Sequence, residues 1–152
     1  MNFKTISLWI FVAIALATLM DTLFSFKTIT EEVIYSRATK EQYFNAARNS
    51  HTTYKVITAN HSFYVDEVFH GTTQPGDRIE IKQSLLFDEI NGYKKEGSAN
   101  YEMSNMRIVS GYASSIAMLL VAILGFQFKN KVNTLVFVTQ SLTLGNFIYL
   151  IQ

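Results

Sequence analysis

Cysteine is absent from the whole chain of 152 residues. This absence excludes disulfide bonds, thiolate nucleophiles and zinc sites with cysteine ligands, whichever compartment the protein occupies. A polar domain in this chain must therefore fold by burying apolar surface alone.

Charged residues are almost missing from three long stretches of the chain. Each stretch is about 20 residues long, which is what a helix needs to cross a hydrocarbon core roughly 30 Å thick. The three apolar runs are Ile6–Phe26, Ile108–Phe128 and Val132–Ile151, and the only charged residue in them is Asp21. The pattern predicts three transmembrane helices.

The polar residues between the first and second runs form one insert, and their order divides the chain into three parts. We expect residues 1–26 to be an N-terminal transmembrane signal anchor and residues 108–152 to be a transmembrane helical hairpin. Residues 27–107 are expected to form a small, mainly-β extracytoplasmic domain, barrel-like or sandwich-like, with one short helix.

Sequence motifs of common catalytic sites are also missing. The chain has no G-x-S-x-G, no S-x-x-K, no glycine-rich phosphate loop, no dinucleotide-binding fingerprint and no His-Glu-x-x-His. Its 13 Lys and Arg nearly balance its 12 Asp and Glu, so no basic surface for nucleic acid is indicated. We expect a non-enzymatic protein with no cofactor and no nucleic-acid partner.

The basic residues beside the runs predict the orientation in the membrane. Lys4, Lys129 and Lys131 flank the runs on one side, and Lys27 and Arg107 flank them on the other. Cytoplasmic flanks carry the excess of Lys and Arg, whereas a long insert crosses the membrane regardless of its charge. The N-terminus is therefore predicted to be cytoplasmic. The short, cysteine-free insert is typical of a periplasmic domain held in a bacterial inner membrane.

A cleavable signal peptide is the competing interpretation of the N-terminus. Lys4 supplies a basic start, and Ala15-Leu16-Ala17 fits a cleavage site of small residues. The apolar run, however, continues past this site to Phe26. We therefore expect an uncleaved anchor.

The start of the insert contains a helix signal and an ambiguous stretch. Thr39 and Gln42 have the spacing of a capping box, which predicts a short helix from about Lys40 to Arg48. The preceding residues, Glu32–Ala38, fit either a strand or a continued helix.

The middle of the insert has the clearest strand pattern. A turn at Ala59-Asn60 would pair Thr52–Thr58 with His61–Val68 and place apolar side chains on one face. The expected pairs are Tyr54 with Val65, Val56 with Phe63, Lys55 with Tyr64 and Thr53 with Asp66. A turn at Pro75-Gly76-Asp77 and strict alternation then predict a third strand over Arg78–Lys82.

Asn91-Gly92 is the strongest short hairpin signal in the chain, since both residues tolerate positive φ. A hairpin there would place Ile90 opposite Tyr93. A short helix from Ser84 is the alternative.

All three histidines lie in the insert, but their spacing argues against a shared metal ion. His61 is at the predicted turn and His51 at the open end of the hairpin, roughly 24 Å away at about 3.4 Å per residue. His51 and His70 could approach each other near Glu67, yet exposed surface positions are the expected role. A weak N-glycosylation sequon at Asn60 is consistent with the same turn.

Polar side chains inside the runs are the candidate functional residues. In the first run they recur on one helical face, and in the others small and polar residues allow close helix contact or hydrogen bonds across helices. The candidate intramembrane contact residues are Thr18, Asp21, Thr22, Ser25, Gly111, Ser114, Gln140, Thr143 and Asn146. No Lys or Arg lies within the runs to pair with Asp21. Its expected polar neighbours are Thr18, Thr22 and Ser25 on the same helical face, and Asn146, the polar residue of the third run at the most similar depth.

These observations favour a non-enzymatic accessory or scaffold subunit of a larger membrane complex. Its partners would be the lipid bilayer and other integral membrane proteins, with a homo-oligomer as a further form. The alternative is a stand-alone, membrane-anchored sensor or binding module for a periplasmic peptide, glycan or protein. A third interpretation makes Asp21 part of an ion or proton pathway, since intramembrane carboxylates are functional candidates by default.

Overall fold

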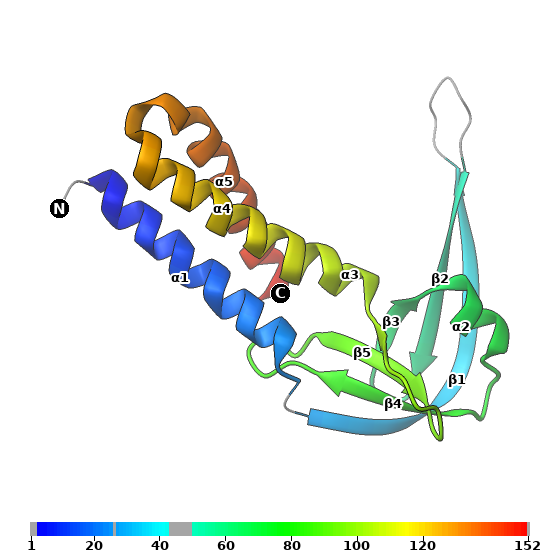
Figure 1. Cartoon of the computed structure of the whole chain (residues 1–152). Helices are drawn as coiled ribbons and strands as arrows, with labels where there is room; N and C mark the ends of the chain where they lie inside the picture. Colours follow the sequence, from blue (N-terminus) through cyan, green and yellow to red (C-terminus); the bar gives the residue numbers. More distant parts are fainter. Residues whose placement is uncertain (1–2, 26, 43–49, 152) are drawn as a thin grey trace. The chain divides into compact units, whose positions relative to one another are not determined.

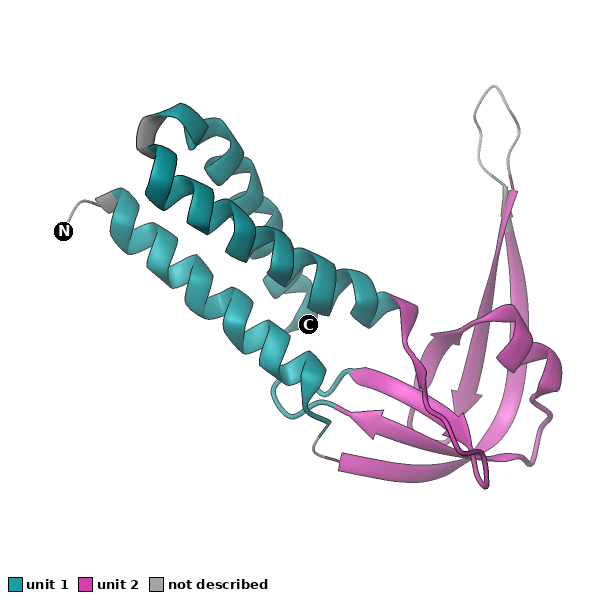
Figure 2. Cartoon of the chain, viewed as in Figure 1, with its two compact units in different colours: residues 1–26, 84–89, 106–152 teal, residues 27–83, 90–105 magenta. Residues whose placement is uncertain are grey.

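The computed structural model describes residues 3–25, 27–42 and 50–151, and it divides the chain into two compact units (Figure 2). The helical unit comprises Met1–Phe26, Ser84–Glu89 and Met106–Gln152. The β unit comprises Lys27–Gln83 and Ile90–Asn105. The helical unit therefore includes the loop Ser84–Glu89 and Arg107, which the sequence alone assigns to the insert.

The helical unit is built on three long helices that lie side by side (Figure 1). Its elements are α1 (Phe3–Leu23), α3 (Asn105–Arg107) from Met106 onward, the π-helical segment η1 (Ile108–Ala113), α4 (Ser114–Phe128), the 3-10 turn η2 (Lys129–Val132) and α5 (Asn133–Leu150). Leu8 and Ala15 of α1 are buried against Met118 and Ala122 of α4. The two alanines allow the helix axes to approach closely.

Two of the described helices are long and apolar enough to cross a membrane. They are Lys4–Leu23 and the continuous helical stretch Asn105–Phe128. The third run forms α5, which has the length of a span but contains more polar residues, including Asn133, Gln140 and Asn146.

The described part of the β unit contains a six-stranded antiparallel sheet with one short helix. Its elements are β1 (Lys27–Gln42), β2 (Ser50–Thr58), β3 (Ser62–Val65), α2 (Glu67–Thr72), β4 (Arg78–Gln83), β5 (Ile90–Lys95) and β6 (Glu102–Met103). The strand order is β3-β2-β1-β4-β5-β6. The mainly-β fold expected from the sequence is therefore present.

Strand β1 joins the two halves of this sheet. Its residues 27–32 pair with β4, and residues from Val33 onward pair with β2. The register shifts between Val33 and Tyr35, and Val33 there exchanges backbone hydrogen bonds with Asp77 and Gly76. Such irregularities bend a strand and increase its twist. The sheet accordingly curls into a half-barrel (Figure 1).

The core of the β unit lies inside the curled sheet. Aromatic rings pack at its centre, where Tyr93 contacts Phe63 and Phe69 at ring-centroid distances of 5.3 and 4.7 Å. The buried residues are Val33, Val56, Phe63, Val65, Phe69, Ile79, Ile81, Ile90 and Tyr93. They come from β1 to β5 and from α2, whose N-terminus is capped by the Asp66 side chain. The sequence did not predict α2.

The predicted first hairpin is confirmed in its position and register. β2 and β3 pair Tyr54 with Val65, Lys55 with Tyr64 and Val56 with Phe63. The expected pair of Thr53 with Asp66 is wrong, because β3 ends at Val65. Residues 67 and 68 of the predicted strand lie in α2 instead. The third predicted strand is also confirmed, as β4.

The predicted helix after Thr39 is wrong where the structure describes it. Lys40, Glu41 and Gln42 continue β1 and pair with Thr52, His51 and Ser50 of β2. Residues 43–48 of the predicted helix lie outside the described residues. A short helix is costly to nucleate, whereas β2 offers this segment a full ladder of hydrogen bonds. The ambiguous stretch Glu32–Ala38 is likewise strand.

The predicted hairpin at Asn91-Gly92 is wrong, and so is the alternative helix from Ser84. Both Asn91 and Gly92 lie inside β5, where Ile90 pairs with Gln83 and Tyr93 pairs with Ile81. A Cβ on Gly92 would come within 2.9 Å of the Glu102 carbonyl oxygen. The glycine therefore permits β6 to approach closely rather than forming a turn.

Glu31 holds the turn of the first hairpin. Its carboxylate accepts hydrogen bonds from the hydroxyl of Thr58, from Asn60 Nδ2 at 3.0 Å and from the ring Nδ1 of His61, also at 3.0 Å. Burial would raise the pKa of Glu31, but these hydrogen bonds and the charge of His61 lower that pKa from 4.5 to about 2. The carboxylate is therefore stabilised in its ionised form.

Replacing the carboxylate by an amide should destabilise the β unit in a pH-dependent way. We expect Glu31→Gln to lower the free energy of unfolding at pH 7 by about 2 kcal/mol, since hydrogen bonds to charged groups are lost. A lowered pKa stabilises the fold above the unfolded-state pKa of 4.5, and this stabilisation disappears as the pH falls through about 2. The difference between wild type and variant should therefore shrink below about pH 5.

Unfolding of the detergent-solubilised chain, followed by circular dichroism at several pH values, measures this difference. Glu32→Gln is the matched control, because Glu32 is the neighbouring residue and is exposed. We expect it to change stability by less than about 0.5 kcal/mol. An equal loss in both variants would contradict the role of Glu31.

Candidate functional site

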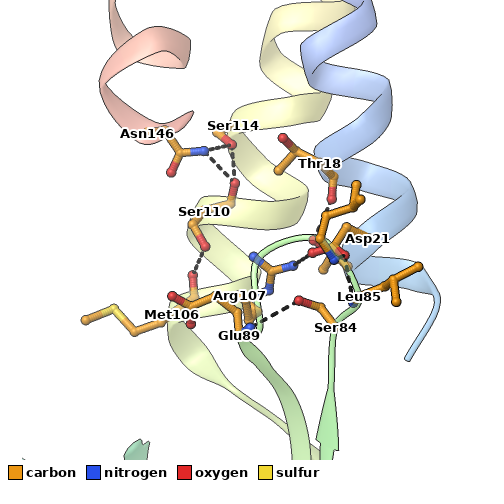
Figure 3. Close-up of polar contacts among 12 residues, drawn as sticks. Thr18, Asp21, Ser84, Leu85, Glu89, Met106, Arg107, Ser110, Ser114 and Asn146 are labelled. Carbon is orange, nitrogen blue, oxygen red and sulfur yellow. Dashed lines mark hydrogen bonds and ion pairs between the residues drawn. The ribbon is translucent and has the colours of Figure 1, made fainter. Parts of the chain in front are cut away.

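A fully buried ion pair lies in the helical unit between Asp21 and Arg107 (Figure 3). The Arg107 Nη2 atom lies 3.0 Å from the Asp21 Oδ2 atom, and the exposed fraction of both side chains is 0%. Asp21 lies two residues before the end of α1, and Arg107 is the last residue of α3, directly before η1. The pair therefore ties the end of the first helix to the start of the second.

The second oxygen of Asp21 binds the backbone of the loop Ser84–Glu89. The N–H group of Leu85 donates to Asp21 Oδ1 at 3.0 Å (Figure 3). The N–H group of Leu86 donates to the same oxygen at 2.7 Å. One carboxylate thus joins α1 to two segments that are far from it in the sequence.

Arg107 corrects the expectation that Asp21 lacks a basic partner. The apolar run begins at Ile108, but the helix that contains it begins at Asn105. Arg107 therefore lies in the first turn of the helix and not in the insert. A buried carboxylate needs a compensating charge, so the position of Arg107 directly beside the second run could have identified it as the partner of Asp21.

The loop closes on itself as well as on Asp21. The Ser84 N–H donates to the Glu89 carbonyl at 2.9 Å, and the Glu89 N–H donates to Ser84 Oγ at 3.1 Å. Burial raises the pKa of the Glu89 carboxyl. The positive charge of Arg107 opposes this shift, and the negative charge of Asp21 adds to it.

Thr18, Thr22 and Gly111 meet beside the ion pair. Thr22 Oγ1 donates to the Thr18 carbonyl at 2.8 Å, and both threonines are buried. Gly111 lies in η1, and a Cβ at this position would collide with the Thr22 side chain. The backbone of η1 therefore rests directly on α1.

Asn146 does not contact Asp21 as the sequence predicted, but contacts the start of the second helix. Its Nδ2 atom donates to the Ser110 carbonyl at 2.9 Å and to Ser114 Oγ at 3.1 Å (Figure 3). Both amide hydrogens are thus used between α5 and the η1–α4 segment. The expected partnership of Asn146 with Asp21 is replaced by this contact.

The remaining predicted contact residues are spread along the helices. Gln140 Nε2 of α5 donates to Ser7 Oγ of α1 at 3.2 Å, and Thr143 is buried on the same helix. Ser25 lies past the end of α1 and is exposed. The predicted residues therefore form several separate helix contacts and not one polar cluster.

The histidines form no shared site in the described residues. His61 binds Glu31 at the hairpin turn, whereas His70 contacts Ser36 Oγ and stacks on Tyr54 at a centroid distance of 4.8 Å. Within residues 3–25, 27–42 and 50–151, no three His, Asp or Glu side chains are arranged to hold a metal ion.

Comparison of the chain with protein-family models, with curated proteins and with solved structures gives no significant match. The interpretation of the site therefore rests on its geometry. The Asp21 carboxylate binds a guanidinium and two backbone N–H groups and is shielded from solvent. Its chemical role in this arrangement is to join chain segments.

Removing one charge should destabilise the helical unit more than removing both. We expect Arg107→Met to cost about 3–5 kcal/mol, because it leaves a buried carboxylate without its cation. In the double variant Asp21→Asn/Arg107→Met, the amide oxygen still accepts from Leu85 and Leu86 and no charge is left behind. The double variant should therefore be more stable than Arg107→Met alone.

Unfolding in mixed detergent micelles measures these free energies, and hydrogen exchange at Leu85 and Leu86 reports on the loop. Lys131→Met removes an exposed positive charge from the link between helices and serves as the control. A double variant no more stable than Arg107→Met would contradict the pairing.

The close contact between Gly111 and Thr22 leads to a second prediction. Gly111→Ala should separate η1 from α1 and lower the free energy of unfolding by about 1–3 kcal/mol, the usual cost of overpacking. Gly145→Ala in α5 is the matched control, because no atom lies within 4 Å of its added Cβ. Equal thermal stability of the two variants in detergent would show that the contact at Gly111 is not tight.

Proposed function

We propose that this protein is a non-enzymatic accessory or scaffold subunit of a larger membrane protein complex. In this proposal α1, the stretch Asn105–Phe128 and α5 cross a bacterial inner membrane, with the N-terminus in the cytoplasm. The curled β unit is then held in the periplasm, where it is presented to partners.

The ion pair is the observation that carries this proposal. Asp21 and Arg107 compensate each other, and the remaining carboxylate oxygen is bound by two backbone N–H groups. A transport site needs a carboxylate that can exchange its ligand or proton with a water-filled path. The full burial of this pair favours a structural tie over the ion or proton pathway.

The surface of α5 supports a third span despite its polar residues. Most of its large apolar side chains are exposed, whereas Gln140, Thr143 and Asn146 contact the other helices or are buried. The exposed residues include Leu135, Phe137, Val138, Leu142, Leu144 and Ile148. Such an outward apolar face suits lipid or the helices of a membrane partner.

The stand-alone sensor remains the second candidate, and one feature of the β unit favours it. Ile34, Tyr35 and Tyr64 are exposed on its strands, with exposed fractions between 41% and 55%. Exposed aromatic residues are common in surfaces that bind proteins. In that case the β unit would bind a periplasmic peptide, glycan or protein without a membrane partner.

Purification from native membranes separates the two candidates. The tagged chain in mild detergent should carry other integral membrane proteins in a fixed ratio. Arg107→Met should lose them, because a loosened helical unit no longer presents its docking surface. Asp21→Asn/Arg107→Met should retain more of them, since the helices stay joined without a buried charge. Mass spectrometry of the purified fractions gives these ratios.

Lys131→Met is the control for this experiment and should retain the full set of partners. A wild-type chain that purifies alone would contradict the accessory-subunit proposal and favour the sensor. Partner ratios that are equal in wild type and Arg107→Met would show that assembly does not depend on the ion pair.

A further inference from the structure

The loop Ser84–Glu89 has an apolar composition that is unusual for a loop in water. Its centre is Leu85-Leu86-Phe87, and the exposed fractions of the two leucines are 60% and 61%. Neighbouring apolar side chains exposed in this way indicate a surface that meets something other than water.

The level of this loop along the helices is fixed by two contacts. The N–H groups of Leu85 and Leu86 bind Asp21, two residues before the end of α1. The Phe87 ring meets the edge of Phe147 at a centroid distance of 5.9 Å, three residues before the end of α5. The loop therefore lies beside the last turns of both helices and not beyond their ends.

The helix surface at this level is also apolar. Large apolar side chains near the same ends of the helices are exposed, namely Met20, Leu23, Phe24, Val109, Ile148 and Tyr149. Leu85 and Leu86 extend this surface to a segment that is not helical.

Most backbone N–H groups of the loop already have hydrogen-bond partners within the protein, so they do not require water. Irregular backbone is costly at membrane depth because its N–H groups lack partners there. The N–H groups of Leu85 and Leu86 are bound by Asp21, that of Ser84 by the Glu89 carbonyl, and that of Glu89 by Ser84 Oγ. Four of the six residues of the loop thus have a satisfied N–H inside the helical unit.

We propose that Leu85 and Leu86 insert into the outer leaflet of the membrane, at the boundary between headgroups and acyl chains. This inference rests on the proposed function, since it requires that the helices span a bilayer. Lipid is the occupant because the leucines continue the apolar surface of the helix ends. The Asp21–Arg107 pair, which is buried, then holds a membrane-inserted loop beside the ends of α1 and α5.

Fluorescence quenching by lipid-attached nitroxides tests this insertion. Since the chain has no cysteine, Leu85→Cys and Leu86→Cys can each carry a single fluorescent label at an exposed position. The labelled full-length chains are reconstituted in phosphatidylcholine and phosphatidylglycerol vesicles. The nitroxide is placed near the headgroup in one set of vesicles and near the end of the acyl chain in another.

Two control positions in the helical unit calibrate the measurement. Ile123→Cys labels an exposed position within α4, and Lys131→Cys labels an exposed position in the link η2. We expect the label at Ile123 to be quenched most by the deep nitroxide and the label at Lys131 weakly by both. The labels at Leu85 and Leu86 should be quenched strongly by the shallow nitroxide and less by the deep one.

The controls distinguish failure of this inference from failure of the proposed function. If Ile123 is quenched but Leu85 and Leu86 behave like Lys131, the helices span the bilayer and the loop does not insert. If labels at Leu85 and Leu86 escape both the nitroxides and aqueous iodide, a protein surface covers the loop and the lipid inference is wrong. If Ile123 is not quenched either, both proposals are wrong.

Discussion

The buried charge of Asp21 is the constraint on which the helical unit depends. A carboxylate with no exposed surface is stable only if other groups compensate it, and Arg107 and two loop N–H groups do so. Because Arg107 lies at the start of the second helix and the N–H groups belong to the loop Ser84–Glu89, this one side chain of α1 joins three separate segments. The Arg107 side chain is also fully buried, so its positive charge is compensated by Asp21 and not by water. Each charge of the pair is therefore costly without the other.

The β unit depends on the opposite arrangement, with an apolar centre and charge at its rim. β1 pairs with both halves of the sheet, and the irregularity after Val33 turns these halves toward a common core. Glu31 stabilises the hairpin turn from outside that core. The hairpin register then follows from which side chains face inward, since a slip by one residue would expose Val56 and Phe63.

Local patterns predicted those parts of the structure that depend on local interactions. Alternation along β2, β3 and β4 predicted their positions, because each strand has one buried face. Asn91-Gly92 misled the prediction because Gly92 is required by its close contact with β6 and not by a turn. Arg107 was missed for a different reason. We defined each span as a run almost without charged residues, and this definition leaves out Arg107, the basic partner of the buried Asp21. In addition, no sequence periodicity relates two residues that are 86 positions apart.

That separation has a consequence for how the helical unit forms. Asp21 and Arg107 can meet only when the chain between them has returned to the end of α1, and the N–H groups of Leu85 and Leu86 become available only when the loop has closed. Helices paired without the loop would keep a carboxylate with an unsatisfied oxygen in an apolar environment. Partial assembly is therefore penalised, and loop closure, ion pairing and the contact of Gly111 with Thr22 stabilise one another. A site with this mutual dependence suits a fixed joint among α1, the loop Ser84–Glu89 and the start of the second helix better than a group that must change its ligands during a reaction cycle.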